Sequence, residues 1–438
     1  MGSTKKNIVI IGNGIAGITC ACETRKNSDH NITVISAEAD YFFSRTALMY
    51  VYMGHMKFEH IQPYENNFWK KNRIDLVKAY VKKLDVAGKQ LLVDDGNAIP
   101  YDQLVIATGS KSNKFGWPGQ DLSGVMGMYS KQDLENLERC TPNCQRAVIV
   151  GGGLIGIELA EMLHSRNIAV SFLVREEGFW GSVLPREESE MINRHIREHH
   201  IDLRLNTTLA EILPDANGNA RAVVTDKGEM IECQVVGLTA GVSPNVSFLK
   251  DSGIKLGKGV LVNQYLETNI ENIYAIGDCA EQDEAIDLRK PVEAVWYTGR
   301  IMGHTLAQTL CGKRTAYEPG HWFNSAKFFD IEYQTYGWVW AKPHSYEAQF
   351  YWEHPDGKKA LRISYDKNTR TFLGINCLGI RMRQQFFNEA LTRKLSVDAV
   401  VKNLDKANFD PEMYTRYEPM IRLAFEKNRS TLISTQYE

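Results

Sequence analysis

Two short apolar runs, at residues 8–11 and 147–150, are each followed by a glycine-rich turn and then by a helix-like stretch. An apolar run of this length that ends at glycine is typical of a strand buried on both faces. Further runs of this kind lie at residues 31–35, 103–107, 169–174 and 272–276. Strands that alternate with helical stretches predict an α/β fold built on parallel sheets.

Both turns have the spacing G-x-G-x-x-G of a dinucleotide-binding loop. The first consists of Gly12, Asn13, Gly14, Ile15, Ala16 and Gly17, and the second of Gly151, Gly152, Gly153, Leu154, Ile155 and Gly156. In such a loop the first glycine permits a tight turn, the second lets a pyrophosphate approach the backbone, and the third packs helix against strand. The following helix offers unpaired N–H donors to the phosphates. Two such turns predict two dinucleotides, with electron transfer between them as the simplest use.

Charged side chains after the next strand of each unit are candidates for recognising a ribose. Glu38 lies about twenty residues beyond Gly17, where an acidic side chain accepts hydrogen bonds from ribose hydroxyls. In the second unit, Arg175 and Glu176 stand in adjacent positions at the end of the strand. An acidic residue there binds the 2′-hydroxyl of NADH, whereas an arginine accommodates the 2′-phosphate of NADPH. The sequence therefore leaves NADH or NADPH open.

The order of the elements predicts a split first domain. A dinucleotide-binding unit is expected at residues 1–125 and 246–320, and a second such unit at residues 126–245 is inserted into it. The strand signal returns near residue 272, and a helix is expected at residues 292–310. The fold expected is thus two Rossmann-like α/β domains.

The last part of the chain has a different character. From residue 321 onward, aromatic side chains alternate with turn signals, and helical periodicity resumes near residues 383–393 and 413–426. We expect a C-terminal α+β domain at residues 321–438. Its aromatic cluster is interpreted as a small core plus an interface in preference to a binding platform.

Composition narrows the class of protein. The chain has 438 residues, a formal net charge of −2 and a hydrophobic content of 43%, as expected for a globular protein without a field that attracts nucleic acid. The apolar runs are too short for a membrane span, and the N-terminus runs directly into the first strand. Eight scattered cysteines do not resemble a disulfide framework, so a cytoplasmic location is expected.

These motifs together resemble the FAD-dependent pyridine-nucleotide oxidoreductases, the glutathione-reductase-like flavoproteins, over nearly the whole chain. The matching positions are the first glycine turn with Glu38, then Ala107, Thr108 and Gly109, the second glycine turn with Glu158, and Ile276, Gly277 and Asp278. The resemblance implies that the first turn binds FAD and the second binds NADH or NADPH. It also implies that Asp278 bonds the ribityl or phosphate region of FAD, that Arg45 lies near the pyrophosphate, and that Gly241 belongs to the nucleotide site.

Closer relatives within the family are suggested by the segment at residues 327–331, which is similar to the start of the third domain in coenzyme A disulfide reductases and NADH oxidases. That domain usually forms a dimer interface, so a homodimer is expected. Rubredoxin and ferredoxin reductases look similar throughout. The resemblance makes Glu158 and Trp296 candidate catalytic residues beside the flavin, although a tryptophan in the core would give the same pattern.

Departures from the family pattern decide the chemistry. The C-x-x-x-x-C pair of the disulfide reductases is absent, and Thr46 stands where coenzyme A disulfide reductases carry a single cysteine. A threonine hydroxyl cannot cycle through a mixed disulfide or a sulfenic acid. A lysine that pairs with the equivalent of Glu158 in some ferredoxin reductases is missing near Tyr50.

The sequence thus favours an NAD(P)H-dependent flavoenzyme that passes electrons to a small carrier protein of the ferredoxin or rubredoxin type. The alternatives are a small-molecule reductase or NADH oxidase, and a redox-sensing interaction protein of the apoptosis-inducing-factor type. Cys140 and Cys144 are interpreted as unrelated thiols, with a redox pair left open. His195 and His199 share a helix face, but no third ligand is apparent, so no metal is expected.

Overall fold

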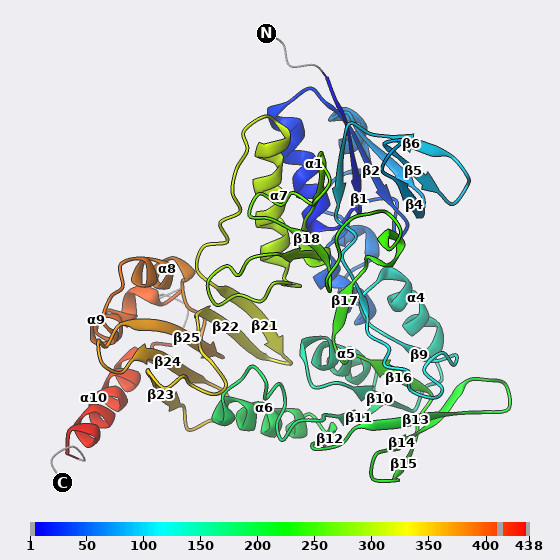
Figure 1. The fold of residues 1–438 in the computed structure, drawn as a ribbon. Helices are drawn as coiled ribbons and strands as arrows, with labels where there is room; N and C mark the ends of the chain where they lie inside the picture. Colours follow the sequence, from blue (N-terminus) through cyan, green and yellow to red (C-terminus); the bar gives the residue numbers. More distant parts are fainter. Residues whose placement is uncertain (1–4, 410–414, 435–438) are drawn as a thin grey trace.

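The computed structural model describes residues 5–409 and 415–434, which form three five-stranded sheets with helices around them (Figure 1). Two of these sheets are parallel and carry the glycine turns, and the third is antiparallel. The expected fold class is therefore confirmed. None of the helices in the described ranges combines the length and the hydrophobicity that a bilayer crossing requires.

The first sheet has the strand order β19-β7-β1-β2-β3 and is parallel throughout. Its strands are β1 (Asn7–Ile11), β2 (Asn31–Ser36), β3 (Ile74–Lys78), β7 (Gln103–Ile106) and β19 (Ile273–Ala275). Helices α1 (Ile15–Asn27) and α7 (Trp296–Leu310) pack closely against each other beside it (Figure 1). The chain thus brings residues near 300 back to the first glycine turn.

The second sheet has the order β12-β11-β10-β16-β9 and is also parallel. Its strands are β9 (Val125–Met126), β10 (Arg146–Val150), β11 (Ala169–Leu173), β12 (Asp202–Arg204) and β16 (Val235–Leu238). The helices of this part are α4 (Lys131–Cys140), α5 (Leu154–Ser165) and α6 (Arg186–Glu198). Both sheets therefore repeat one arrangement, in which an apolar central strand leads through glycines into a helix.

The chain crosses between these two sheets along a two-stranded ribbon. Strand β8 (Ser110–Ser112) leaves the first sheet, strand β17 (Val242–Pro244) returns to it, and the two pair antiparallel. The second sheet thus lies within the chain of the first, in the order that a split unit requires. The exact domain limits expected from the sequence, at residues 125/126, 245/246 and 320/321, stay a prediction.

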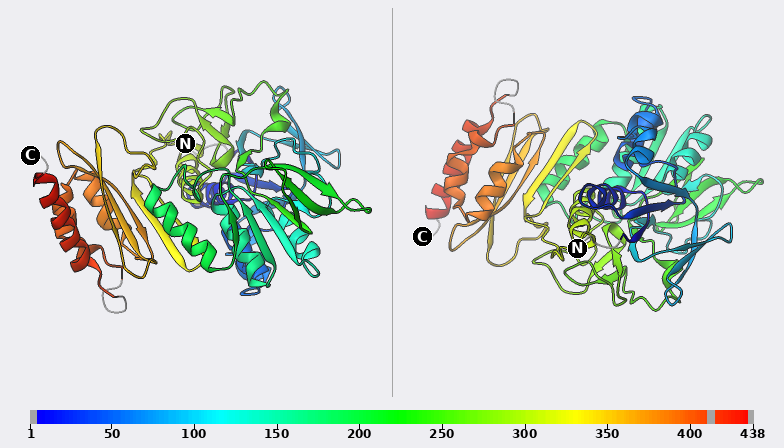
Figure 2. Two further views of the ribbon diagram at one scale, coloured as in Figure 1. Left: turned by 90° about the horizontal axis from the view of Figure 1, so that it is seen from below. Right: turned by 90° about the horizontal axis from the view of Figure 1, so that it is seen from above.

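The C-terminal sheet has the order β21-β22-β25-β24-β23 with antiparallel pairing. Its strands are β21 (Phe323–Phe328), β22 (Ile331–Gly337), β23 (Glu347–Glu353), β24 (Ala360–Asp366) and β25 (Phe372–Leu378), followed by helices α8 (Gln384–Thr392), α9 (Val397–Lys402) and α10 (Glu418–Ser434). These helices cover one face of the sheet, and α6 lies on the other side (Figure 2). Helix α6 therefore joins the second sheet to the C-terminal one.

Two helix predictions need correction. The helix expected from residue 292 begins only at Trp296, because the preceding residues form a loop in which Pro291 accepts a hydrogen bond from the backbone of Gln282 and Val295 is extended. The helix expected from residue 413 begins, in the described part, at Glu418. Residues 410–414 lie outside the described residues.

Helix α6 is fastened to the C-terminal sheet by a buried ion pair. The Glu188 side chain is fully buried, and its Oε1 lies 3.1 Å from Nε of Arg362 on β24. Asn376 on β25 donates a hydrogen bond of 2.8 Å to the second oxygen of Glu188. Arg362 also pairs with Glu187 at 2.7 Å. Burial raises the pKa of Glu188 to about 7, although Arg362 and Asn376 oppose the shift.

Candidate functional site

The first glycine turn follows β1 and is held tightly against its own sheet. Gly12 has φ of +115°, and a Cβ at this position would lie 2.1 Å from the carbonyl oxygen of Ala107. A Cβ on Gly17 would lie 2.1 Å from the carbonyl oxygen of Gly12. Glycine is therefore required at both positions. Gly12 permits the turn, and Gly17 permits the close approach of helix α1 to strand β1.

Gly14, in contrast, faces open space. Its backbone is extended, with φ of −73°, and no heavy atom lies within 4 Å of a Cβ built there. Gly14 is the N-cap of α1, and no side chain caps that end of the helix. The Asn13 amide donates to the carbonyl of Ala39 at 2.9 Å and so fixes the loop. The first-turn N–H groups of Ile15, Ala16 and Gly17 thus begin a helix whose dipole favours a phosphate.

The second glycine turn repeats this geometry after β10. Gly151 has φ of +118°, and a Cβ there would lie 2.7 Å from the backbone nitrogen of Ala240. A Cβ on Gly156 would lie 2.4 Å from the carbonyl oxygen of Gly151. Gly153 is extended, caps α5 without a side-chain hydrogen bond and has no heavy atom within 4 Å of its virtual Cβ. Leu154 and Ile155 begin the helix.

Glu38 and Arg45 form an ion pair at the edge of the first glycine turn. Arg45 donates to the two carboxylate oxygens of Glu38 at 2.8 and 2.6 Å, and the backbone N–H of Lys131 donates to Glu38 at 2.8 Å. Burial alone would raise the pKa of Glu38, but the Arg45 guanidinium outweighs it and holds the pKa below its ordinary value. Glu38 is therefore an ionised acceptor, and the ligand roles of both residues stay predictions.

Tyr129 connects Arg45 to Asp278. The phenol donates to Oδ2 of Asp278 at 3.1 Å and accepts a hydrogen bond of 3.0 Å from the backbone of Ser110. The guanidinium carbon of Arg45 lies 4.5 Å from the centre of the Tyr129 ring. Burial raises the pKa of Asp278, with Tyr129 and Arg45 opposing the shift. No sequence pattern points to Tyr129, because it lies in the connection between the two units.

The turn after β7 and the start of α7 complete the surroundings of the first glycine turn. Ala107 lies against Gly12, Thr108 donates to the carbonyl of Asn245 at 2.8 Å, and Gly109 has φ of +64°. Gly277 and Gly299 both lie close to Ala16. A Cβ on Gly277 would lie 2.9 Å from the Ala16 methyl group, and a Cβ on Gly299 would lie 3.6 Å from it.

Trp296, the first residue of α7, is half-buried one turn before Gly299. Its ring centre lies 5.4 Å from that of Tyr297, and the Arg300 guanidinium lies 5.6 Å from the Trp296 ring. The structure thus places Trp296 on the helix that packs against the first glycine turn. Contact with a flavin stays a prediction.

Glu158 lies on α5, two residues beyond the second glycine turn, beside a charge pair that the sequence did not reveal. Lys327 on β21 lies 2.6 Å from Glu161 and 5.8 Å from the centre of the Tyr50 ring. Burial raises the pKa of Glu158 to about 7, Glu161 adds to the shift, and Lys327 opposes it. A lysine thus stands near Tyr50 after all, but it comes from the C-terminal sheet.

The residues expected to choose the nucleotide occupy the rim of the second turn. Arg175 is 80% exposed and pairs with Glu176 at 3.0 Å. Gly241, on the return from β16, has φ of +89° and approaches the Asn113 amide. Because an exposed arginine and a half-buried carboxylate stand side by side, the structure also leaves NADH or NADPH open.

The thiols are unlinked, and burial raises the pKa of several of them. All eight cysteines are free, and none forms a disulfide. Cys279, next to Asp278, is buried, donates its S–H to backbone carbonyls and has a raised pKa caused by burial. Cys140 and Cys144 are half-buried, and burial raises the pKa of Cys144 to about 11. Thr46 is exposed, with its hydroxyl 3.3 Å from that of Ser44.

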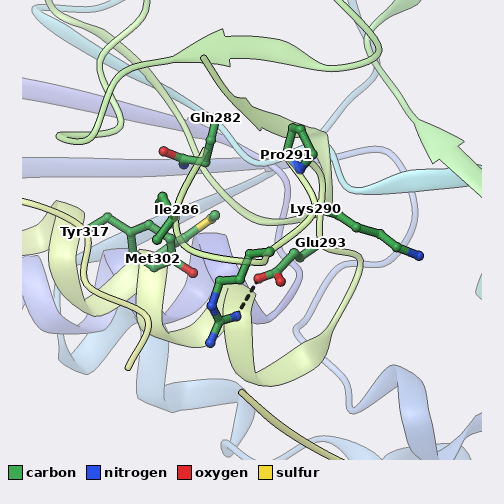
Figure 3. Close-up of a pocket in the computed structure, with 8 residues that line it drawn as sticks. Gln282, Ile286, Lys290, Pro291, Glu293, Met302 and Tyr317 are labelled. Atoms are coloured by element: carbon green, nitrogen blue, oxygen red, sulfur yellow. Dashed lines mark hydrogen bonds and ion pairs between the residues drawn. The ribbon is translucent and has the colours of Figure 1, made fainter. Parts of the chain in front are cut away.

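A small cavity of about 10 Å³ lies beside Met302 of α7, with Ile286 and Tyr317 also in its lining (Figure 3). Arg289 and Glu293 pair across it at 2.8 Å, and Gln282 and Tyr317 contribute buried polar atoms without a described partner. This volume is about that of one water, which would satisfy those atoms. The cavity therefore supports the fold and is too small for a dinucleotide.

The site fits two dinucleotides on structural grounds. Two uncapped helix N-termini each follow a glycine that leaves open space, and an ionised carboxylate lies at the edge of the first. A half-buried carboxylate, Asp278, stands near the same turn with a phenol donor beside it. These groups suit the phosphates and riboses of a dinucleotide.

Comparison with known proteins agrees with this geometry. Residues 6–308 match the model of the pyridine nucleotide-disulphide oxidoreductase family. An NADH oxidase from Methanocaldococcus jannaschii is 31% identical over 74% of this chain and 74% of its own length. A ferredoxin–NAD(P)+ reductase from a Sphingomonas species is 29% identical over 77% of this chain and 82% of its own. The assimilatory nitrate reductase electron transfer subunit of Bacillus subtilis is 27% identical over 70% of this chain, which spans only 39% of that protein.

Solved structures share the fold at lower identity. An NAD-dependent persulfide reductase from A. fulgidus has a TM-score of 0.84 at 23% identity, covering 97% of this chain and 84% of its own. Putidaredoxin reductase in covalent complex with putidaredoxin has a TM-score of 0.80 at 21% identity, covering 90% and 95%. The chain therefore belongs to the pyridine nucleotide-disulphide oxidoreductase family.

Proposed function

We propose that the enzyme transfers a hydride from NADH or NADPH to FAD and then passes electrons to a small carrier protein of the ferredoxin or rubredoxin type. The observation that carries the proposal is the combination of two open glycine turns with thiols that form no disulfide. Without a thiol relay, electrons leave the flavin directly for an external acceptor. FAD, when bound, accepts a hydride and releases electrons singly or in pairs.

The protein's own groups divide the work of binding. In the proposed assignment, residues 1–125 and 246–320 hold FAD, residues 126–245 hold the nucleotide, and residues 321–438 form the interface of a homodimer. The N-terminus of helix α1 binds the FAD pyrophosphate. Glu38, which Arg45 keeps ionised, accepts hydrogen bonds from the ribose hydroxyls. Tyr129 orients the Asp278 carboxylate toward the cofactor.

Several relatives support a protein acceptor. Besides the ferredoxin–NAD(P)+ reductase, the rubredoxin–NAD+ reductase of Acinetobacter baylyi is 29% identical over 70% of this chain and 79% of its own length. Eight free thiols also suit the reducing cytoplasm, where we place the enzyme. The second candidate, an NADH oxidase, is favoured by the relative from Methanocaldococcus jannaschii. Thr46, at the position of a cysteine in such oxidases, counts against thiol-dependent oxygen chemistry.

Rapid-mixing kinetics test the proposal. The FAD-loaded enzyme, reduced by NADH or NADPH without air, is mixed with an oxidised ferredoxin, an oxidised rubredoxin or dissolved oxygen. We expect a carrier protein to reoxidise the flavin at least about tenfold faster than oxygen does. Reoxidation by oxygen that equals or exceeds the rate with every carrier would contradict the proposal and favour the oxidase.

The charge state of Glu158 is expected to control flavin reduction. Hydride loss leaves a positive nicotinamide ring, which a nearby carboxylate stabilises. Because the pKa of Glu158 lies near 7, the rate constant for flavin reduction should rise about three- to tenfold as pH increases through 7. Glu158→Gln should abolish the rise and hold the rate at the low-pH value.

A neighbouring variant makes this prediction specific. Glu161→Gln removes a charge that raises the pKa of Glu158 and frees Lys327 to face it. The midpoint of the pH profile should therefore move to lower pH. A profile that is the same in the unmodified enzyme and in Glu158→Gln would exclude this role for Glu158.

A further inference from the structure

Helix α6 and the turn between β21 and β22 bring together three side chains of the types that ligate metals, away from both glycine turns. His195 lies on α6, His199 follows the helix as its C-cap, and Asp330 occupies the turn. Nε2 of His195 lies 2.7 Å from Oδ1 of Asp330, and Nε2 of His199 lies 3.5 Å from the same oxygen. Three such atoms, one from each residue, lie within 4.8 Å of one another.

His195 is buried without the hydrogen bonds that a buried imidazole requires. It is 1% exposed, and neither ring nitrogen has a hydrogen-bond partner among the described residues. Its nearest polar neighbour is Oδ1 of Asp330, 2.7 Å from Nε2, and this contact does not have the geometry of a hydrogen bond. Nδ1 faces Glu198 at 3.6 Å. A buried polar group without a hydrogen bond lowers the stability of the fold unless another partner binds it.

His199 is held in the form that binds a metal. Its Nδ1 lies 3.0 Å from the carbonyl oxygen of His195, and since a carbonyl only accepts, Nδ1 carries the proton. Nε2 then presents its lone pair toward Asp330. The ring stacks on Phe329, with centroids 4.2 Å apart and planes 18° apart, which fixes its orientation. A hydrogen bond from the second ring nitrogen to a carbonyl is the usual support of a ligating histidine.

We propose that His195, His199 and Asp330 bind a divalent transition-metal ion of the zinc type through two imidazole nitrogens and one carboxylate oxygen. Zinc binds such atoms at about 2.0–2.2 Å, which sets them about 3.3 Å apart in a tetrahedron. The 3.5 Å contact already meets this spacing, and Asp330, at 61% exposure, is free to widen the 2.7 Å contact. A water molecule fills the fourth position. The ion clamps α6 to the C-terminal sheet, independently of the proposed function.

Lys358 is the competing cation of this site. Its ammonium lies 4.0 Å from Oδ2 of Asp330 and 3.9 Å from Glu198. The side chain is 47% exposed and can move into solvent when a metal ion takes the carboxylate. Its removal should therefore strengthen metal binding without touching any ligand.

Calorimetry with Zn²⁺ tests the site on the full-length, FAD-loaded enzyme prepared without a histidine tag and stripped of metal by chelator. We expect one Zn²⁺ per chain, and a melting temperature that rises when Zn²⁺ is added. Co²⁺ should give absorption bands at wavelengths beyond those of the flavin. Asp330→Asn and His199→Gln should each weaken binding at least about 100-fold, since even outer partners of a ligand contribute about 10–100-fold.

Two variants provide matched comparisons. His200→Asn removes an exposed imidazole next to the site in a left-handed conformation that asparagine tolerates, and it should leave Zn²⁺ affinity unchanged. Lys358→Gln should tighten binding. Absence of stoichiometric binding, or equal losses in Asp330→Asn and His200→Asn, would overturn the proposal.

Discussion

Gly14→Ala is expected to yield a folded protein that is nearly free of flavin, whereas Gly153→Ala is expected to yield a yellow enzyme that binds NADH and NADPH poorly. Both glycines are extended and face open space, so alanine costs the fold little at either position. The added methyl instead occupies the space that a pyrophosphate needs. Overlap worth about 1–3 kcal/mol corresponds to about 10–100-fold in affinity.

Each variant is the control for the other, because the two positions share geometry and differ in the cofactor they serve. Flavin content after purification and the KM for the nucleotide are the two measurements, and circular dichroism checks the fold. Loss of flavin from both variants alike, or full flavin retention in Gly14→Ala, would refute the assignment of FAD to the first turn.

Arg362→Leu is expected to cause the largest loss of stability, about 3–5 kcal/mol in the free energy of unfolding. The substitution leaves the fully buried Glu188 without its cationic partner. The folded-state pKa of Glu188, already raised from 4.5 to about 7, should then rise further. At a pH between the unfolded-state pKa of 4.5 and the raised folded-state pKa, the folded protein keeps a proton on Glu188 that the unfolded protein releases. The free energy of unfolding therefore falls as pH rises through this range.

Denaturant unfolding at pH 5.5 and 8 should therefore show the larger loss at the higher pH. Arg186→Met gives the matched control on the same helix, because Arg186 pairs with Glu190 in solvent and is 87% exposed. It should leave the free energy of unfolding nearly unchanged. Similar effects from the two variants would show that the buried pair is not what fastens α6.

The parallel sheets and both glycine turns could be predicted because their signals are local. Apolar runs such as residues 8–11 and 147–150 mark buried strands, and the last glycine of each turn meets the first one five residues before it. Gly12 and Gly151 also have the positive φ that the pattern requires. Helix α7 begins later than the helical pattern predicts, because the hydrogen bond between Gln282 and Pro291 and the extended Val295 keep the preceding residues in a loop.

The missed residues act through contacts between distant parts of the chain. Tyr129 meets Asp278, Lys327 approaches Glu158 beside Glu161, and Asp330 completes the histidine pair of α6. No spacing in the sequence relates these partners, since each pair is joined only when separate sheets pack. Lys327 and Asp330 both come from the C-terminal sheet, which the sequence described mainly by its aromatic content.

The ribbon of β8 and β17 and the buried pair of Glu188 with Arg362 secure the nucleotide-binding part at two separate places. Parting α6 from the C-terminal sheet would separate Glu188 from Arg362, which costs free energy. We therefore expect a dinucleotide to enter and leave without a wide rotation of the second sheet. Turnover in such a scaffold should depend on local movements of side chains and loops.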